Sequence, residues 1–181
     1  MDTETHPNQL TMTFPTDTTP AQLLYPDMIQ ELASTRKMLA LVPNGHDDFK
    51  PHEKSMSLGS LATHLAELPV FGTTILTTVE LDFAAQPWAP RKFDNTLERL
   101  EAFDRNAAAM TSRVDGATWD MLGERWIMRA GEQIYVDEQK AKLLRSFCLS
   151  HMAHHRAQLG VYLRLLGLMI PGTYGPSADE M

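Results

Sequence analysis

Apolar side chains recur every three or four positions along four stretches of the chain, which predicts four amphipathic helices. The first helix has two possible beginnings. Thr19-Pro20 resembles a helix cap followed by a proline in the first turn, and Pro26 would fit a first turn as well. The apolar spacing continues to Val42, and Pro43 is expected to stop the helix.

The second and third helices are expected over residues 57–79 and 95–115. A serine opens the second helix, and Pro69 is expected to kink it or to insert a bulge, because proline removes one backbone donor. Asp94 or Asn95 caps the third helix, and an Asp-Gly pair ends it.

The fourth helix is expected to run from about residue 137 to residue 166 and to end at Gly167. Before it, residues 117–136 contain two short runs of aromatic and β-branched side chains around a glycine, which predicts a β-hairpin. The tail, residues 167–181, is rich in glycine and proline and is expected to pack across one end of the helices.

These patterns together predict an all-α protein, a four-helix bundle with a short β-hairpin between the third and fourth helices. Residues 1–18 are polar, so we expect a flexible N-terminal arm before a single domain over residues 19–181. The chain has 181 residues and 43% hydrophobic side chains, enough for a substantial core. The connections over residues 43–56 and 117–136 are too long for tight turns between neighbouring helices, so we expect at least one of them to cross over the bundle.

The charge balance excludes some classes of partner. Sixteen basic and 23 acidic residues give a net charge of −7, which disfavours nucleic acid and anionic membrane surfaces. A single cysteine excludes an internal disulfide framework. The N-terminal residues lack the apolar segment of a secretory signal, and no stretch is apolar enough to span a membrane, so we expect a cytoplasmic protein.

Three histidines lie on the apolar faces of two predicted helices. His151 and His155 are one helical turn apart on the fourth helix, a spacing that allows both rings to bind one metal ion. His64 shares the apolar side of the second helix. The neighbouring His154 lies at the edge of the apolar stripe and is the weaker candidate.

Each of these histidines alone would more commonly be a hydrogen-bonded core residue, but the three together favour a metal site. Three imidazoles leave coordination positions open for water or substrate, as catalytic zinc sites do. We expect a divalent ion, zinc or nickel first, with iron or copper as alternatives.

Two further residues near the histidines have alternative interpretations. Glu67 could act as a catalytic group, by orienting an imidazole or contacting a metal-bound water, or could be a solvated carboxylate. Cys148 could be a ligand or a reactive thiol, but a small buried apolar residue is the simpler interpretation. Arg156 is expected off the face of the site, and Gln158 on it. A solvated face of the third helix is expected from its charged residues Glu98, Arg99, Glu101, Asp104 and Arg105.

At these residues the sequence resembles the DinB/YfiT-like family of metal-binding four-helix bundles, over residues 24–180. The segment HEKSMSLGSLATHLAELP places His64 at the family's first ligand, and HMAHHRAQLGVYLRLLG matches its His-x3-His pair with His151 and His155. The ending IPGTYGPSADE is also found in many members. The resemblance implies an up-down-down-up bundle, a metal site of these three histidines and a homodimer.

The resemblance also implies possible activities. Some members are metal-dependent transferases that conjugate a low-molecular-weight thiol, such as bacillithiol or mycothiol, to an electrophile. The first hypothesis is therefore a thiol S-transferase, with a small-molecule thiol and an electrophile as partners. A metal-dependent hydrolase, with Glu67 as the candidate general base, is the second hypothesis. A non-catalytic, stress-linked module that binds a metal or a small ligand is the third.

Overall fold

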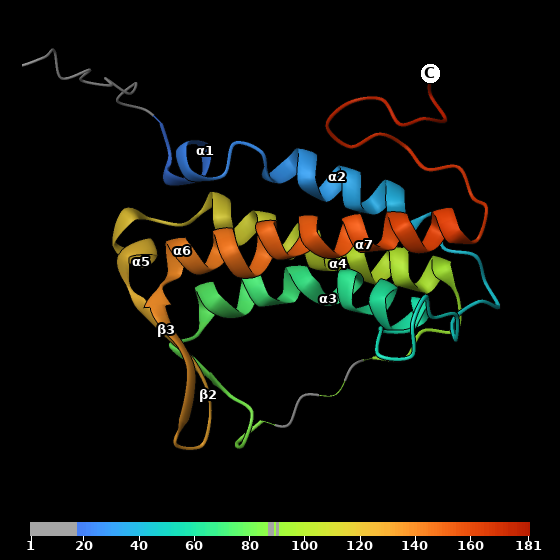
Figure 1. Ribbon diagram of the computed structural model, residues 1–181. Helices are drawn as coiled ribbons and strands as arrows, with labels where there is room; N and C mark the ends of the chain where they lie inside the picture. Colours follow the sequence, from blue (N-terminus) through green and yellow to red (C-terminus); the bar gives the residue numbers. More distant parts are fainter. Residues whose placement is uncertain (1–17, 87–88, 90) are drawn as a thin grey trace, which may run out of the picture.

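The computed structural model describes residues 18–86, 89 and 91–181. They form a mainly helical body with a three-stranded sheet attached at one end (Figure 1). The predicted arm of residues 1–18 lies, apart from Thr18, outside the described residues. In chain order the elements are α1 (Pro20–Leu24), α2 (Met28–Leu39), α3 (Leu58–Thr77), β1 (Glu80–Asp82), α4 (Thr96–Asp115), α5 (Trp119–Gly123), β2 (Arg125–Ala130), β3 (Gln133–Gln139), α6 (Lys140–Leu143), the π-helical segment η1 (Leu144–Ser150) and α7 (His151–Leu165).

The first predicted helix is two helices. The hydroxyl of Thr19 caps α1 by accepting a hydrogen bond from the backbone N–H of Gln22 at 3.2 Å. This helix ends before Pro26, which has no N–H to continue the hydrogen-bonding pattern. α2 then starts two residues later, so both possible beginnings noted in the sequence correspond to helices.

The long helices pack side by side, and their contacts show their directions (Figure 1). α3 and α4 run the same way, because Asn106 donates to the carbonyl of Ala66 and, further along both helices, Met110 lies against Gly72. A β-carbon at Gly72 would lie 2.4 Å from the Met110 sulfur, so only glycine permits this close approach. α7 runs opposite to α3, as two contacts show: His151 with His64, and Tyr162 with Met56.

The core lies between these helices and extends to the base of the sheet. Trp126 on β2 is 1% exposed, and its ring N–H donates to the hydroxyl of Thr78 at 2.9 Å. The other largest buried side chains come from the long helical segments and α5: Phe103, Leu39, Leu58, Leu61, Leu65, Leu68, Ile75, Met110, Leu122, Met152 and Leu159.

The predicted hairpin is confirmed, and it belongs to a larger sheet. β2 and β3 pair antiparallel around Gly131, whose φ of 57° suits the tight turn. The short strand β1 pairs parallel with β2 on its other edge, with Glu80 opposite Ile127. Arg129 fastens this edge by donating to both carboxylate oxygens of Glu80, at 2.8 and 2.9 Å. No pattern in the sequence predicted β1.

Three other expectations need correction. The fourth helix begins at Lys140 rather than near residue 137, because β3 continues to Gln139. Arg99 is not part of a solvated face: its side chain is 3% exposed and pairs with Asp47. The tail does not only cover one end of the helices, because it folds back so that Tyr174 donates to Glu31 on α2.

None of the helices among the described residues is both long enough and apolar enough to cross a membrane.

Candidate metal centre

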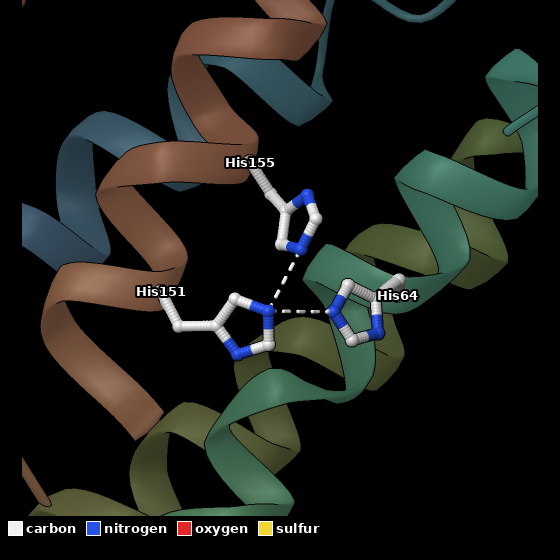
Figure 2. A group of neighbouring side chains, drawn as sticks. All are labelled: His64, His151 and His155. Atoms are coloured by element: carbon white, nitrogen blue, oxygen red, sulfur yellow. Dashed lines mark hydrogen bonds between the residues drawn. The ribbon is translucent and has the colours of Figure 1, made fainter. Parts of the chain in front are cut away.

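The structure brings the three predicted ligands together between α3 and α7. Figure 2 shows their rings pointing toward one another from the two helices. The Nε2 atom of His151 lies 2.8 Å from Nε2 of His155 and 3.4 Å from Nε2 of His64. One ligand atom from each ring lies within 4.8 Å of the other two, a spacing that could hold a single metal ion. All three side chains are half-buried.

The π-helical segment η1 ends where the site begins, and it positions His151. The backbone N–H of His151 bonds the carbonyl of Ser146, five residues back. An α-helix would instead pair that N–H with the carbonyl of Phe147. The π-turn therefore sets the position of His151 at the start of α7.

His155 is oriented by a side chain. Its Nδ1 lies 2.7 Å from Oε1 of Gln158, one turn further along α7. Because an amide oxygen only accepts hydrogen bonds, Nδ1 carries the proton and Nε2 presents a lone pair to the site. The expectation that Gln158 shares the face of the site is correct.

The environment keeps all three rings neutral near pH 7. Burial lowers the pKa of His64 from 6.5 to about 4, assisted by the neighbouring rings of His155 and His151. Burial also lowers the pKa of His151 and of His155, although the backbone at Phe147 and the amide of Gln158 oppose the shift. Neutral imidazoles are the form that binds metal ions.

A pocket of about 830 Å³ opens beside His64. Its lining includes the start of α3, with Ser60 and Thr63, and the loop before α4, with Arg91 and Lys92. The remaining charged lining residues are Asp47, Asp48, Asp94 and Arg99. The position of this loop could not be predicted, because no local sequence pattern shows toward which helix a loop folds.

Glu67 lies outside the histidine cluster. Its Oε1 accepts a hydrogen bond from the backbone N–H of Arg91 at 3.3 Å, and burial raises the pKa of its carboxyl. Within the described part of the chain, its buried Oε2 has no hydrogen-bond partner. The carboxylate is therefore not the solvated surface group considered as its alternative, and its catalytic role stays a prediction.

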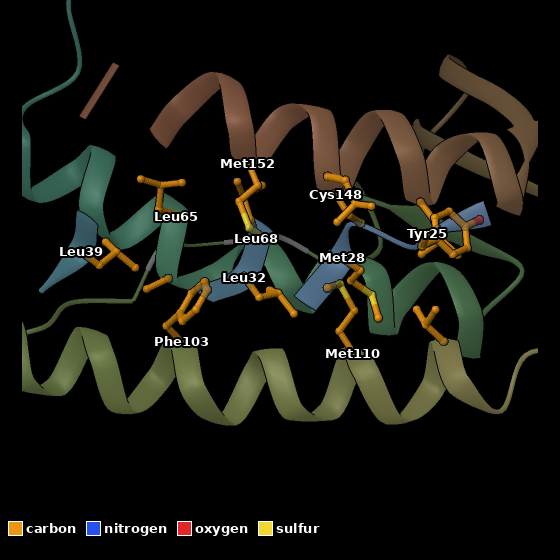
Figure 3. Close-up of a cluster of buried hydrophobic side chains, with 14 of the residues drawn as sticks. Tyr25, Met28, Leu32, Leu39, Leu65, Leu68, Phe103, Met110, Cys148 and Met152 are labelled. Carbon is orange, nitrogen blue, oxygen red and sulfur yellow. The ribbon is translucent and has the colours of Figure 1, made fainter. Parts of the chain in front are cut away.

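The other candidates do not join the cluster of ligand atoms found among the described residues. Cys148 points into the hydrophobic core (Figure 3), where burial raises the pKa of its thiol to about 12. It is therefore a packing residue. The exposed ring of His154 lies 4.9 Å from the His155 ring but contributes no ligand atom to the cluster. His46 and His52 are exposed in the loop before α3.

The lowered histidine pKa values predict that acid destabilises the metal-free protein. Below pH 6.5 the unfolded chain takes up protons that the folded site does not accept. The stabilising contribution of these groups is therefore present above pH 6.5 and is lost as the pH falls toward about 4. Urea unfolding of chelator-treated protein between pH 7 and pH 4.5 should show this loss.

Replacing His64 with glutamine should reduce the number of protons taken up on unfolding by up to about one, and so should reduce this pH dependence. His52→Gln, at an exposed loop position, is the control. An equal pH dependence in His64→Gln and the unchanged protein would contradict the assignment of the shift to burial at the site.

The sequence also matches a family model, described as the DinB family, over residues 15–181. The chain belongs to the DinB family. Three crystal structures share its fold. A DinB-like protein, YjoA, from Bacillus subtilis has a TM-score of 0.64 at 17% identity, covering 83% of this chain and 96% of that one.

The other two are a DinB-like protein from Bacillus cereus ATCC 10987 and a DinB family protein from Exiguobacterium sibiricum 255-15. Their TM-scores are 0.60 and 0.57, at 19% and 22% identity. They cover 83% and 88% of this chain, and 95% and 96% of their own chains. In sequence, the uncharacterized protein YrdA of Bacillus subtilis (strain 168) is 46% identical over 37 residues. That match covers 20% of this chain and only 22% of YrdA.

Proposed function

We propose that this DinB-family protein is a metal-dependent enzyme that transfers a low-molecular-weight thiol to an electrophilic small molecule. The divalent ion would be held by His64, His151 and His155. The observation that carries the proposal is the convergence of three neutral imidazole nitrogens beside an open pocket. We expect zinc or nickel first, with iron or copper as alternatives.

The donor set fits a cation. The Nδ1 atom of His155 is engaged by the amide oxygen of Gln158, so its Nε2 carries a lone pair that faces Nε2 of His151 at 2.8 Å and could bind a cation. The Nε2 atoms of all three rings point toward one another, and a divalent ion among them would take a lone pair from each ring.

The pocket supports a small polar substrate. Its lining combines three acidic and three basic side chains with hydroxyl groups, which suits a molecule with charges of both signs. A divalent ion bound by three neutral ligands would keep its full charge and would lower the pKa of a thiol placed beside it. In the overall reaction, the thiol loses its proton and its sulfur bonds to the electrophilic carbon. The proton leaves with the displaced group or, in an addition, returns to the product.

The main test is turnover of a model electrophile by protein loaded with zinc or nickel. We expect consumption that requires both the metal and a low-molecular-weight thiol, measured with a panel of common cellular thiols. His64→Ala should reduce the rate to that of the uncatalysed reaction, since one metal ligand and one pocket-lining side chain are lost. His154→Ala, at an exposed neighbouring position on α7, should retain the wild-type rate.

The same experiment distinguishes the other two functions. Consumption of an ester or amide without thiol would indicate a hydrolase, and loss of that activity in Glu67→Gln would implicate the buried carboxyl. The structure does not favour this function, because Glu67 contacts Arg91 instead of the histidines. Stoichiometric metal binding with no turnover for any thiol would indicate a binding module and would overturn the transferase proposal.

A further inference from the structure

The three histidines differ in what holds their second ring nitrogen, Nδ1. Within the described part of the chain, the side-chain hydrogen bonds of His151 are those of its Nε2 to the other two rings. His155 bonds the amide of Gln158, at 2.7 Å. Among the described residues, no hydrogen-bond partner is found for Nδ1 of His64. The orientation of one ligand therefore depends on a side chain that can be replaced.

Gln158 makes little other contribution to the fold. Its side chain is exposed on α7, and among the described residues its side-chain hydrogen bond is the one to His155. An exposed glutamine loses conformational freedom when it is held in one geometry, so stability alone gives little reason for this contact. The contact does, however, decide which nitrogen of His155 carries the proton.

We propose that Gln158 is a positioning residue for the metal site: it holds His155 in the Nδ1–H tautomer and aims Nε2 at the point shared with His64 and His151. This inference rests on the metal site of the proposed function. Without an acceptor at Nδ1, the ring can rotate and can place its proton on Nε2 instead. That tautomer must change before the ring can bind a metal ion.

The choice of an amide also has a chemical consequence. A carboxylate at the same place would donate more electron density to the ring and add a negative charge beside the site. The neutral amide fixes the tautomer without doing so. The charge of a bound ion would therefore remain more available for activating a substrate.

The test compares Gln158→Leu, which removes the acceptor, with Gln158→Glu, which keeps one. Zinc affinity is measured by competition with a chromophoric chelator, so the readout does not depend on activity. We expect Gln158→Leu to bind zinc about 10- to 100-fold more weakly, the usual cost of losing such a partner. Gln158→Glu should bind zinc at least as tightly as the unchanged protein.

Gln133→Leu provides a matched control, because it makes the same substitution at an exposed position of β3. It should leave zinc affinity unchanged. Thermal unfolding of metal-free Gln158→Leu should match that of the unchanged protein, since the side chain is exposed. A similar loss of affinity in both leucine variants would overturn the proposal.

A second measurement keeps the positioning role separate from the proposed metal site. Nitrogen-15 NMR of the metal-free protein reports the tautomer of each histidine. We expect an Nδ1–H tautomer for His155 in the unchanged protein and a mixture in Gln158→Leu. An unchanged tautomer in the variant would overturn the role of Gln158. Failure of the unchanged protein to bind any metal would instead overturn the metal site, whatever the tautomer.

Discussion

Replacing His151 with alanine is expected to abolish stoichiometric metal binding. Its Nε2 atom contacts both other rings, at 2.8 Å from Nε2 of His155 and 3.4 Å from Nε2 of His64. Its loss leaves one ligand on each helix. We expect affinity to fall by more than about 100-fold, beyond the effect of losing a supporting hydrogen bond. Metal content per chain, measured by plasma mass spectrometry on untagged protein, tests this.

The matched control is His154→Ala, three residues away on the same helix. His154 is exposed and contributes no ligand atom to the cluster, so its variant should retain one metal per chain. If His151→Ala bound metal as the unchanged protein does, the ion would lie elsewhere and the three-histidine site would be wrong. Equal loss in both variants would point to an indirect effect on α7.

The helices and their boundaries could largely be predicted, because the signals for them are local. Thr19 and Asn95 cap helices where the sequence indicates, each by accepting from a backbone N–H three residues later. Hydrophobic periodicity located the buried faces for the same reason, since a helix repeats its face every turn. This periodicity also placed His64, His151 and His155 toward a common centre.

Features that depend on long-range contacts could not be predicted. Strand β1 is three residues long and exists through its pairing with β2, more than 40 residues away. Arg99 looks like a surface residue in sequence, but Asp47 in a distant loop pairs with it and buries it. The π-turn before His151 has no local signal of its own, although it leads directly into that ligand. The candidate ligands and the neighbouring Gln158 could thus be predicted, whereas the π-turn and the loop that lines the pocket could not.

The second large effect is expected at a buried ion pair that joins α7 to α2. Arg156 and Glu31 have side chains 2% and 7% exposed, with Nη1 and Oε2 2.7 Å apart. The guanidinium also donates to the hydroxyl of Tyr174 at 2.7 Å, and Tyr174 donates to Glu31 at 2.8 Å. Arg156 follows His155 directly, but it lies off the face of the metal site and points toward α2, and the sequence predicted that it would lie off that face.

We expect Arg156→Leu to lower the free energy of unfolding by about 3–5 kcal/mol, because it leaves the Glu31 carboxylate buried without its partner. The double variant Glu31→Leu/Arg156→Leu should lose clearly less than the sum of the two single variants. The double variant buries two leucine side chains and no charge, whereas each single variant leaves one charge buried without its partner. Urea unfolding of the four proteins at pH 7 measures this coupling. Additive losses would contradict it and would mean that water, rather than the partner residue, satisfies each charge.

Because neither side chain touches the histidines, the double variant should still bind one metal ion per chain. That result would separate the forces that hold α7 in the fold from the chemistry that α7 presents.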